Sequence, residues 1–195
     1  MADVLGREIV PGAAMLAVTM ASHFGRVFAD PAGSGWLLAA TDVGRRPDVW
    51  GTCYALLLGV LSGDEARAAR DAIIAALHAG TITFEGGVRH VPTDHDASPT
   101  SAWDQVAPGV AVNTYQNGAY WHTPTGWLVA AIQKYEPVLA GKVFQAYLAH
   151  LREQDFRRGP TFGAPWECFG KAGAARQNPV YMASVTTPLA AIEQL

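Results

Sequence analysis

The segment "SGDEARAARDAIIAALHAG", residues 62–80, carries the signals of one complete helix. Ser62 followed by Glu65 three residues later is a capping-box pattern, which predicts that a helix begins near Asp64. Gly80 predicts where this helix ends, because glycine readily adopts the left-handed conformation that closes a helix. The apolar residues inside the segment recur at helical spacing and form one face: Ala66, Ala69, Ile73 and Leu77.

Similar signals predict helices on both sides of this segment. Apolar residues at helical spacing, and prolines suited to a first helical turn, indicate further helices over residues 10–28, 48–61, 124–135, 137–155 and 179–192. Between them, residues 81–84 and 88–91 flank a Glu-Gly-Gly turn and predict one small β-hairpin. The pattern therefore favours an all-α fold of about six helices with a single hairpin.

The connections between the predicted helices alternate in length. The joints at residues 62–63 and at Glu136 are tight, whereas those before Asp48, Pro124 and Pro179 are long and rich in Trp, Asn, Gln and Arg. When helical hairpins stack side by side, alternate connections lie at the same end of the assembly. We therefore expect the three long connections to share one face, at helix N-termini that present free backbone N–H groups.

Composition and charge exclude several classes of protein. The chain has 195 residues, of which 50% are hydrophobic and 16% charged, so residues 1–195 are expected to form one domain with a sizeable core. A net charge of -3 and the absence of a basic run argue against a nucleic-acid partner. The apolar run over residues 13–20 is too short to span a membrane. It shows no convincing cleavage site, so a cytoplasmic location is favoured.

Cys53 and Cys168 fit no metal-binding spacing and are expected to be reduced, buried thiols. The stretch "RHVPTDHD", residues 89–96, matches no familiar set of metal ligands either. Fingerprints for nucleotides and dinucleotides are also absent from the sequence. Neither a metal nor a cofactor is therefore predicted.

The second long connection ends in "YQNGAYWHTPTGW", residues 115–127, which contains four large aromatic rings and no charged residue other than histidine. Flat apolar rings beside amide and hydroxyl groups suit a carbohydrate. The competing interpretation is that the rings simply wedge between helices. The residues that we assign to sugar binding in this stretch are Tyr115, Gln116, Asn117, Tyr120 and Trp121.

The other two long connections contribute carboxylates and further aromatic residues. In the third, Glu167 lies between Trp166 and Cys168, and a carboxylate in apolar surroundings suits a proton-transfer role, although it could instead pair with Arg176 or Lys171. In the first, the candidate residues are Arg46, Asp48 and Trp50. A purely structural role, as a helix cap with a surface ion pair, explains them equally well.

Three stretches together resemble the C-terminal half of the six-hairpin glycosidases, the superfamily of debranching-enzyme, glucoamylase and trehalase-like (α/α) barrels. The stretches are "DVWGTCYALLLGVLSGDEA", "YQNGAYWHTPTGWLVAAI" and "PWECF" followed by "QNPVYMASVTTPLAAI". The resemblance covers the chain from about residue 36 to its end. It implies an (α/α) toroid, and because a closed barrel needs twelve helices, this chain is expected to form a half barrel. The remaining helices would come from a missing N-terminal half or from another chain; alternatively, the chain is a shortened relative that no longer catalyses.

The resemblance also implies an inverting glycoside hydrolase that acts on an oligosaccharide or glycoside. Glu167 matches the late glutamate that serves as general base in such barrels, and Asp48 is the candidate for a second carboxylate or a substrate ligand. The side chains expected to contact the sugar are Trp50, Tyr115, Tyr120, Trp121 and Trp166 by stacking, and Arg46, Gln116, Asn117 and Gln177 by hydrogen bonds.

Three alternatives remain open from the sequence. The chain could bind carbohydrate without hydrolysing it, or it could serve as a structural partner subunit. It could also be a sugar epimerase or isomerase on a similar toroid, which would need a histidine-based proton shuttle built from residues in the loops: His90, His95 and His122.

Overall fold

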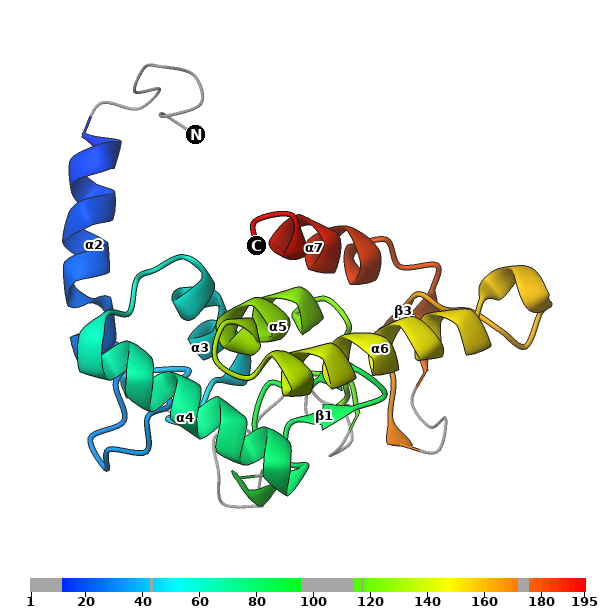
Figure 1. Ribbon diagram of the computed structural model, residues 1–195, viewed down its shortest axis with the longest axis horizontal. Helices are drawn as coiled ribbons and strands as arrows, with labels where there is room; N and C mark the ends of the chain where they lie inside the picture. Colours follow the sequence, from blue (N-terminus) through cyan, green and yellow to red (C-terminus); the bar gives the residue numbers. More distant parts are fainter. Residues whose placement is uncertain (1–11, 43, 96–113, 117, 172–175) are drawn as a thin grey trace.

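The structure is a computed structural model that describes residues 12–42, 44–95, 114–116, 118–171 and 176–195. This part of the chain is mostly helical, as predicted, and is drawn in Figure 1. The helices are α2 (Ala13–Phe28), α3 (Val49–Leu57), α4 (Gly63–Ala79), α5 (Thr125–Gln133), α6 (Pro137–Glu153) and α7 (Ala183–Ile192). Short 3-10 turns lie between α4 and α5, at η1 (Thr93–His95), and after α6, at η3 (Phe156–Arg158).

Helix α5 is the centre of the packing, with α3, α6 and α7 around it and α4 against both α3 and α5 (Figure 1). Its sequence is apolar on all sides, and Leu128 and Ile132 are completely buried. A helix of this composition is stable only when it is enclosed, since each buried side chain of this size contributes about 1.5–3 kcal/mol. The three helices that follow the long connections therefore lie side by side in the order α3, α5, α7.

The helix predicted from residues 62–80 is confirmed, with its apolar face buried and Gly80 in the left-handed conformation at its C-terminal end. The capping box is not formed, because Ser62 makes no side-chain capping hydrogen bond. The carboxylate of Glu65 lies instead against the backbone of Gly25 in α2. Glu65 therefore contacts a neighbouring helix rather than the start of its own.

Helix α3 is shorter than predicted and ends at Leu57 rather than near Leu61. Gly59 adopts a positive φ of 67°, and the next backbone N–H, that of Val60, donates to the carbonyl of Ala55 at 2.9 Å. This closure is typical of a helix C-terminus and turns the chain toward α4. Gly59, which was not used in the prediction, therefore terminates the helix.

Helices α5 and α7 begin later than the sequence predicts. Helix α5 begins at Thr125 rather than at Pro124, and Thr123 does not cap it. Helix α7 begins at Ala183, because the Asn-Pro pair at residues 178 and 179 belongs to a β-strand instead. Proline is compatible with the first turn of a helix but does not fix the residue at which the helix begins. The polar residue before it caps the helix only if its side chain has no other partner.

Two antiparallel hairpins are present where one was predicted: β1 (Thr83–Phe84) with β2 (Gly87–Val88), and β3 (Trp166–Cys168) with β4 (Gln177–Pro179). The first confirms the Glu-Gly-Gly turn, in which Glu85 and Gly86 both have positive φ, as a two-residue hairpin turn of this hand requires. The second was not predicted, because its strands are short and separated by eight residues.

Helix α2 projects from the rest of the molecule and touches it only near its C-terminal end (Figure 1). Phe24 and Phe28 pack against the body beside Leu37 and Leu61. The remaining apolar side chains of α2 are exposed, and the largest are Met15, Leu16, Val18 and Met20. Within the described residues, no helix has the combination of length and hydropathy that a membrane crossing requires.

Candidate functional site

The three long connections meet, as predicted, through backbone hydrogen bonds. The N–H of Val49, at the start of α3, donates to the carbonyl of His90 at 2.8 Å. Val88 and Trp121 exchange two backbone hydrogen bonds of 2.8 and 3.1 Å, and Tyr120 and Phe169 exchange two more of 2.8 and 2.9 Å. The hairpin β1–β2 is thus extended by segments of the second and third connections, which fixes these loops relative to each other.

Glu167 lies in β3 and is buried, with 7% of its surface exposed. The side-chain amide of Asn178, in the paired strand β4, donates to Oε2 of this glutamate. The hydroxyl of Tyr115 donates to Oε1 at 3.4 Å, a long contact. A buried carboxylate requires such donors, and Glu167 receives them from two different connections. The side-chain hydrogen bonds of Glu167 thus come from Asn178 and Tyr115, and not from Arg176 or Lys171, the ion-pair partners considered from the sequence.

An aromatic cluster lies beside this carboxylate. Trp50 stacks on His90 with ring centroids 3.6 Å apart, and both rings meet Trp121 edge-on at 5.5 and 5.7 Å. Trp121 is in turn 5.3 Å from the ring of Tyr115. The cluster therefore leads from the start of α3 to the tyrosine that contacts Glu167.

Among the residues that the structure describes, the buried indole N–H groups of Trp121 and Trp166 have no hydrogen-bond partner. A buried donor without a partner is unfavourable by about 1–3 kcal/mol. A ligand oxygen or a water molecule at these positions would satisfy it. Trp166 itself is half-buried, with the guanidinium of Arg176 5.8 Å from its ring centroid.

The remaining residues assigned to sugar binding have varied surroundings. Gln116 is exposed beside Tyr115, and Gln177 is half-buried in β4 opposite Cys168. Tyr120 is 3% exposed and packs between Phe84 and Phe169, which argues for a role in packing. Asn117 lies outside the described residues.

The first connection contributes a cap and a tie between loops. Asp48 is the N-cap of α3, and its Oδ1 accepts from the N–H of Gly51 at 2.9 Å, the capping role that the sequence left open. Burial is the main cause that raises the pKa of Asp48, against the lowering effect of the backbone hydrogen bonds to it. Arg46 donates to the carbonyl of His95 at 2.8 Å and so fastens this connection to the second one.

The three histidines that an isomerase would use lie in different surroundings. His122 is completely buried beside His150, with Tyr147 and Phe169 packed on its ring. Burial lowers its pKa to about 3, with a smaller contribution from His150. His90 stacks on Trp50, and His95 is exposed beside Asp94. These contacts give no support to a shared proton shuttle.

Both cysteines are free and buried, as predicted. Burial raises the pKa of both thiols, for Cys168 to about 12, with the charge of Glu167 as a further cause. Protonated thiols are poor nucleophiles and poor metal ligands. In the described part of the chain, no group of three or more His, Cys, Asp or Glu residues is arranged to hold a metal ion.

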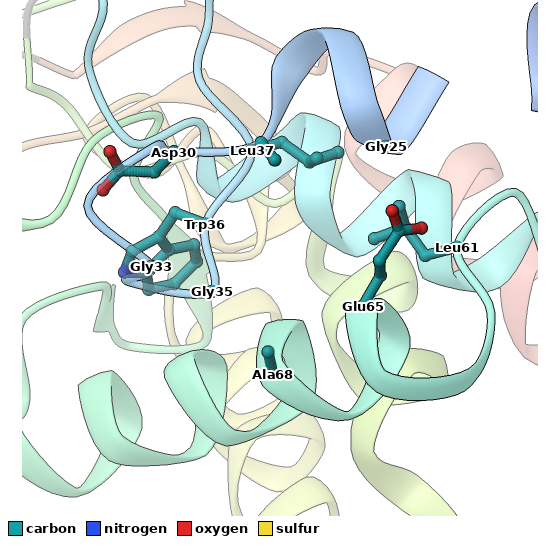
Figure 2. A pocket seen from close by; sticks show the side chains of 10 residues that line it. Gly25, Asp30, Gly33, Gly35, Trp36, Leu37, Leu61, Glu65 and Ala68 are labelled. Atoms are coloured by element: carbon teal, nitrogen blue, oxygen red, sulfur yellow. The ribbon is translucent and has the colours of Figure 1, made fainter. Parts of the chain in front are cut away.

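A cavity of about 160 Å³ lies away from this site, between α2, α4 and the segment after α2 (Figure 2). Its wall includes the ring of Trp36 and the backbone of three glycines, with the carboxylate of Glu65 directed toward Gly25. None of the residues predicted to act on a sugar lines it. We assign the candidate site to the surroundings of Glu167, where the predicted residues converge.

Two members of the site were missed in the sequence. Asn178 was interpreted only as part of a helix start, although asparagine tolerates the left-handed backbone conformation that it adopts here. From the sequence, His90 is a candidate only for proton transfer or for a metal ligand in residues 89–96. No local pattern announces either contact, because Glu167 is 11 residues from Asn178, and Trp50 belongs to a different connection from His90.

The chain has been compared with models of protein families, with curated proteins and with solved structures. None of the three comparisons finds a match.

Proposed function

We propose that this chain is part of an inverting glycoside hydrolase in which Glu167 is the general base. The observation that carries the proposal is the buried carboxylate of Glu167 beside the aromatic cluster, with contributions from all three long connections. Carbohydrate-binding sites combine aromatic faces with neutral hydrogen-bonding groups. The indole N–H groups of Trp121 and Trp166, which have no partner in the described part of the chain, add two donors suited to hydroxyl oxygens.

The reaction assigns opposite proton transfers to two carboxyl groups. Glu167 would accept a proton from a water molecule while that oxygen forms a bond to the anomeric carbon. A protonated acid would donate to the departing glycosidic oxygen as its bond to the same carbon breaks. Asp48 is the candidate for this acid, because its raised pKa favours the protonated form.

A second candidate function is carbohydrate binding without hydrolysis. The observation that favours it is the position of Asp48, whose Oδ1 accepts a hydrogen bond from the helix that it caps. A carboxyl group that serves as an acceptor for a helix is less suited to release a proton to a substrate. In this case the aromatic cluster and the donors around Glu167 would hold a sugar that is not cleaved.

The arrangement of helices supports a partial (α/α) toroid. Helices α3, α5 and α7 follow the long connections, and α5 packs between the other two. The exposed apolar side chains of α2, including Met15 and Met20, favour packing against further helices of the same assembly. Those helices would come from another chain or from another part of the same protein.

Glu167→Gln tests the proposal, because it keeps the shape of the side chain and removes the base. The purified chain is incubated with neutral oligosaccharides and aryl glycosides, release of reducing sugar is measured, and binding is followed by calorimetry. We expect the variant to lose hydrolysis by a factor of about 10²–10⁴ while it binds within a few-fold of the unmodified chain.

Glu193→Gln, at an exposed position after α7, is the matched control and should retain full activity. Retained turnover in Glu167→Gln would exclude this glutamate as the base. Binding without hydrolysis by the unmodified chain would favour the second candidate function. If the unmodified chain shows neither binding nor hydrolysis, both candidate functions are overturned.

A further inference from the structure

Both side chains that donate to Glu167 are attached to backbone in a left-handed conformation. Among the described residues other than glycine, four have positive φ: Glu85 at 48°, Tyr115 at 45°, Asn178 at 44° and Val180 at 58°. Two of these four are the hydrogen-bond donors of Glu167, and Val180 is two residues from one of them. Such backbone is unfavourable for residues with a Cβ and persists where the surrounding structure enforces it, often at functional sites.

The backbone around Asn178 is held on both sides. Residues on its N-terminal side pair with β3, where Gln177 lies opposite Cys168. On its C-terminal side, the N–H of Val180 donates to the carbonyl of Gly163 at 3.0 Å, and that of Tyr181 donates to Pro165 at 2.7 Å. These bonds fix the direction in which the Asn178 side chain leaves the backbone, and that direction is toward Glu167.

We infer that Asn178 is a positioning residue for Glu167 and that Tyr115 assists it. The amide of Asn178 holds Oε2, and the tyrosine hydroxyl lies 3.4 Å from Oε1, so the two donors orient the carboxylate plane from opposite oxygens. Neither donor carries a charge, so both hold the carboxylate by neutral hydrogen bonds. This inference rests on the proposed role of Glu167 as general base.

The tyrosine can fulfil its part because it stays protonated. Burial is the main cause that raises the pKa of Tyr115, and the charge of Glu167 raises it further. The phenol therefore remains an O–H donor to the carboxylate at neutral pH. Its longer contact makes it the weaker of the two donors, so its removal should have the smaller effect.

Asn178→Gly separates the hydrogen bond from the backbone conformation, because glycine adopts positive φ without strain and has no amide to donate. Steady-state hydrolysis and the thermal midpoint are measured for this variant, for Tyr115→Phe and for the unmodified chain. We expect Asn178→Gly to lower kcat by about 10–100-fold, because a misplaced catalytic group can cost about 10²-fold. KM should change by less than about twofold, since only the reacting group is displaced.

Val180→Gly is the matched control, because it removes the same kind of backbone strain at an exposed residue two positions away and keeps the backbone N–H that donates to Gly163. It should leave kcat unchanged. If it lowers kcat as much as Asn178→Gly, backbone strain and not the amide is responsible, and the inference is overturned. Should Asn178→Gly lower the thermal midpoint strongly, the kcat and KM of Tyr115→Phe provide the test, with a smaller expected loss of kcat.

The outcomes separate this inference from the proposed function. If the unmodified chain hydrolyses glycosides and Glu167→Gln does not, a normal kcat in Asn178→Gly overturns the positioning role alone. If the unmodified chain shows no hydrolysis, the proposed function and the positioning role fall together. A reduced kcat at constant KM in Asn178→Gly, with Val180→Gly unaffected, supports the inference.

Discussion

Glu85 and Glu167 are two glutamates on neighbouring parts of the same small β-structure, and their partners differ in kind. Glu167 is buried and receives neutral donors from two loops. The side chain of Glu85 is 47% exposed, and its Oε2 is 3.3 Å from Nε2 of His150, a buried residue of α6. Nε2 of His122 lies 3.1 Å from the carbonyl oxygen of Glu85 and 3.3 Å from Nδ1 of His150.

The geometry around Glu85 resembles that of an ion pair, but the histidine is neutral. Burial is the main cause that lowers the pKa of His150 to about 4, and the charge of Arg176 lowers it further. With the proton of neutral His150 on Nε2, this nitrogen donates to the carboxylate and Nδ1 is an acceptor facing Nε2 of His122. The contacts thus fasten the turn of the β1–β2 hairpin to a helix.

The difference between these regions separates fold from function. The partners of Glu85 are two buried residues, His150 of α6 and His122, so changes there should lower stability. The partners of Glu167 are less buried, since Tyr115 is half-buried and Asn178 is exposed, so changes there should alter ligand binding or turnover more than stability. Three tests follow from this division, in order of expected effect on the fold.

The largest effect is expected for Gly86→Ala, in the turn beside Glu85. Gly86 has a φ of 73°, and a Cβ added there would lie 2.2 Å from the backbone nitrogen of Tyr147. The substitution should lower the free energy of unfolding by about 3 kcal/mol or more, through backbone strain and overlap with α6. Urea denaturation measures the change.

The matched control for this variant is Gly141→Ala in the middle of α6, where an added Cβ meets no atom within 4 Å. It should raise the free energy of unfolding by about 0.5–1 kcal/mol, since alanine favours helix. Equal destabilisation by both substitutions would show that the hairpin turn is not fastened to α6 as described.

An intermediate effect is expected from acid, because His122 and His150 have pKa values lowered to about 3 and about 4, chiefly by burial. Unfolded histidines bind protons near pH 6.5, so the unfolded state gains protons first as the pH falls. The stability present above pH 6.5 is therefore lost progressively as the pH falls toward 4 and 3. Denaturation in urea at pH 7 and at pH 4.5 should show this loss.

His150→Gln should have a shallower dependence of stability on pH, because it removes one proton-binding group of the pair. Tyr147→Phe is its control: it deletes the 2.9 Å hydrogen bond from the Tyr147 hydroxyl to the carbonyl of Ser184, in the same cluster. Burial raises the pKa of this phenol to about 12, so it does not titrate in the acid range. The control should lower stability equally at both pH values, and an unchanged slope in His150→Gln would contradict the assignment.

The smallest effect on stability is expected at Asp48, for which two roles are proposed: N-cap of α3 and general acid. Asp48→Ala should lower the free energy of unfolding by about 0.5–2 kcal/mol, because the N-cap of α3 is lost. Asp48→Asn should stay close to the unmodified chain, since asparagine also caps helices. If hydrolysis disappears in the asparagine variant while stability is kept, Asp48 takes part in proton transfer; if hydrolysis is retained, it is a cap.

The helices could be predicted more reliably than their ends. The apolar face of α4 is local information, since residues three and four apart along a helix lie side by side. The end of α3 is also a local signal, because Gly59 adopts positive φ and the N–H of Val60 donates to the nearby carbonyl of Ala55. The start of α7 depends on a distant partner, because the side chain of Asn178 contacts Glu167, so a local pattern does not specify it.

The sequence by itself determined the mostly helical class, the order of the helices, the first hairpin and the expectation that three polar, aromatic connections lie together. It could do so because helix periodicity, turn chemistry and connection length are local properties. Only the tertiary structure decided that Asn178 and Tyr115 contact Glu167, that Tyr120 packs in the core, and that Asp48 caps α3. A side chain acquires such a role from the groups that surround it in space, and here those groups come from segments as far as 52 residues apart.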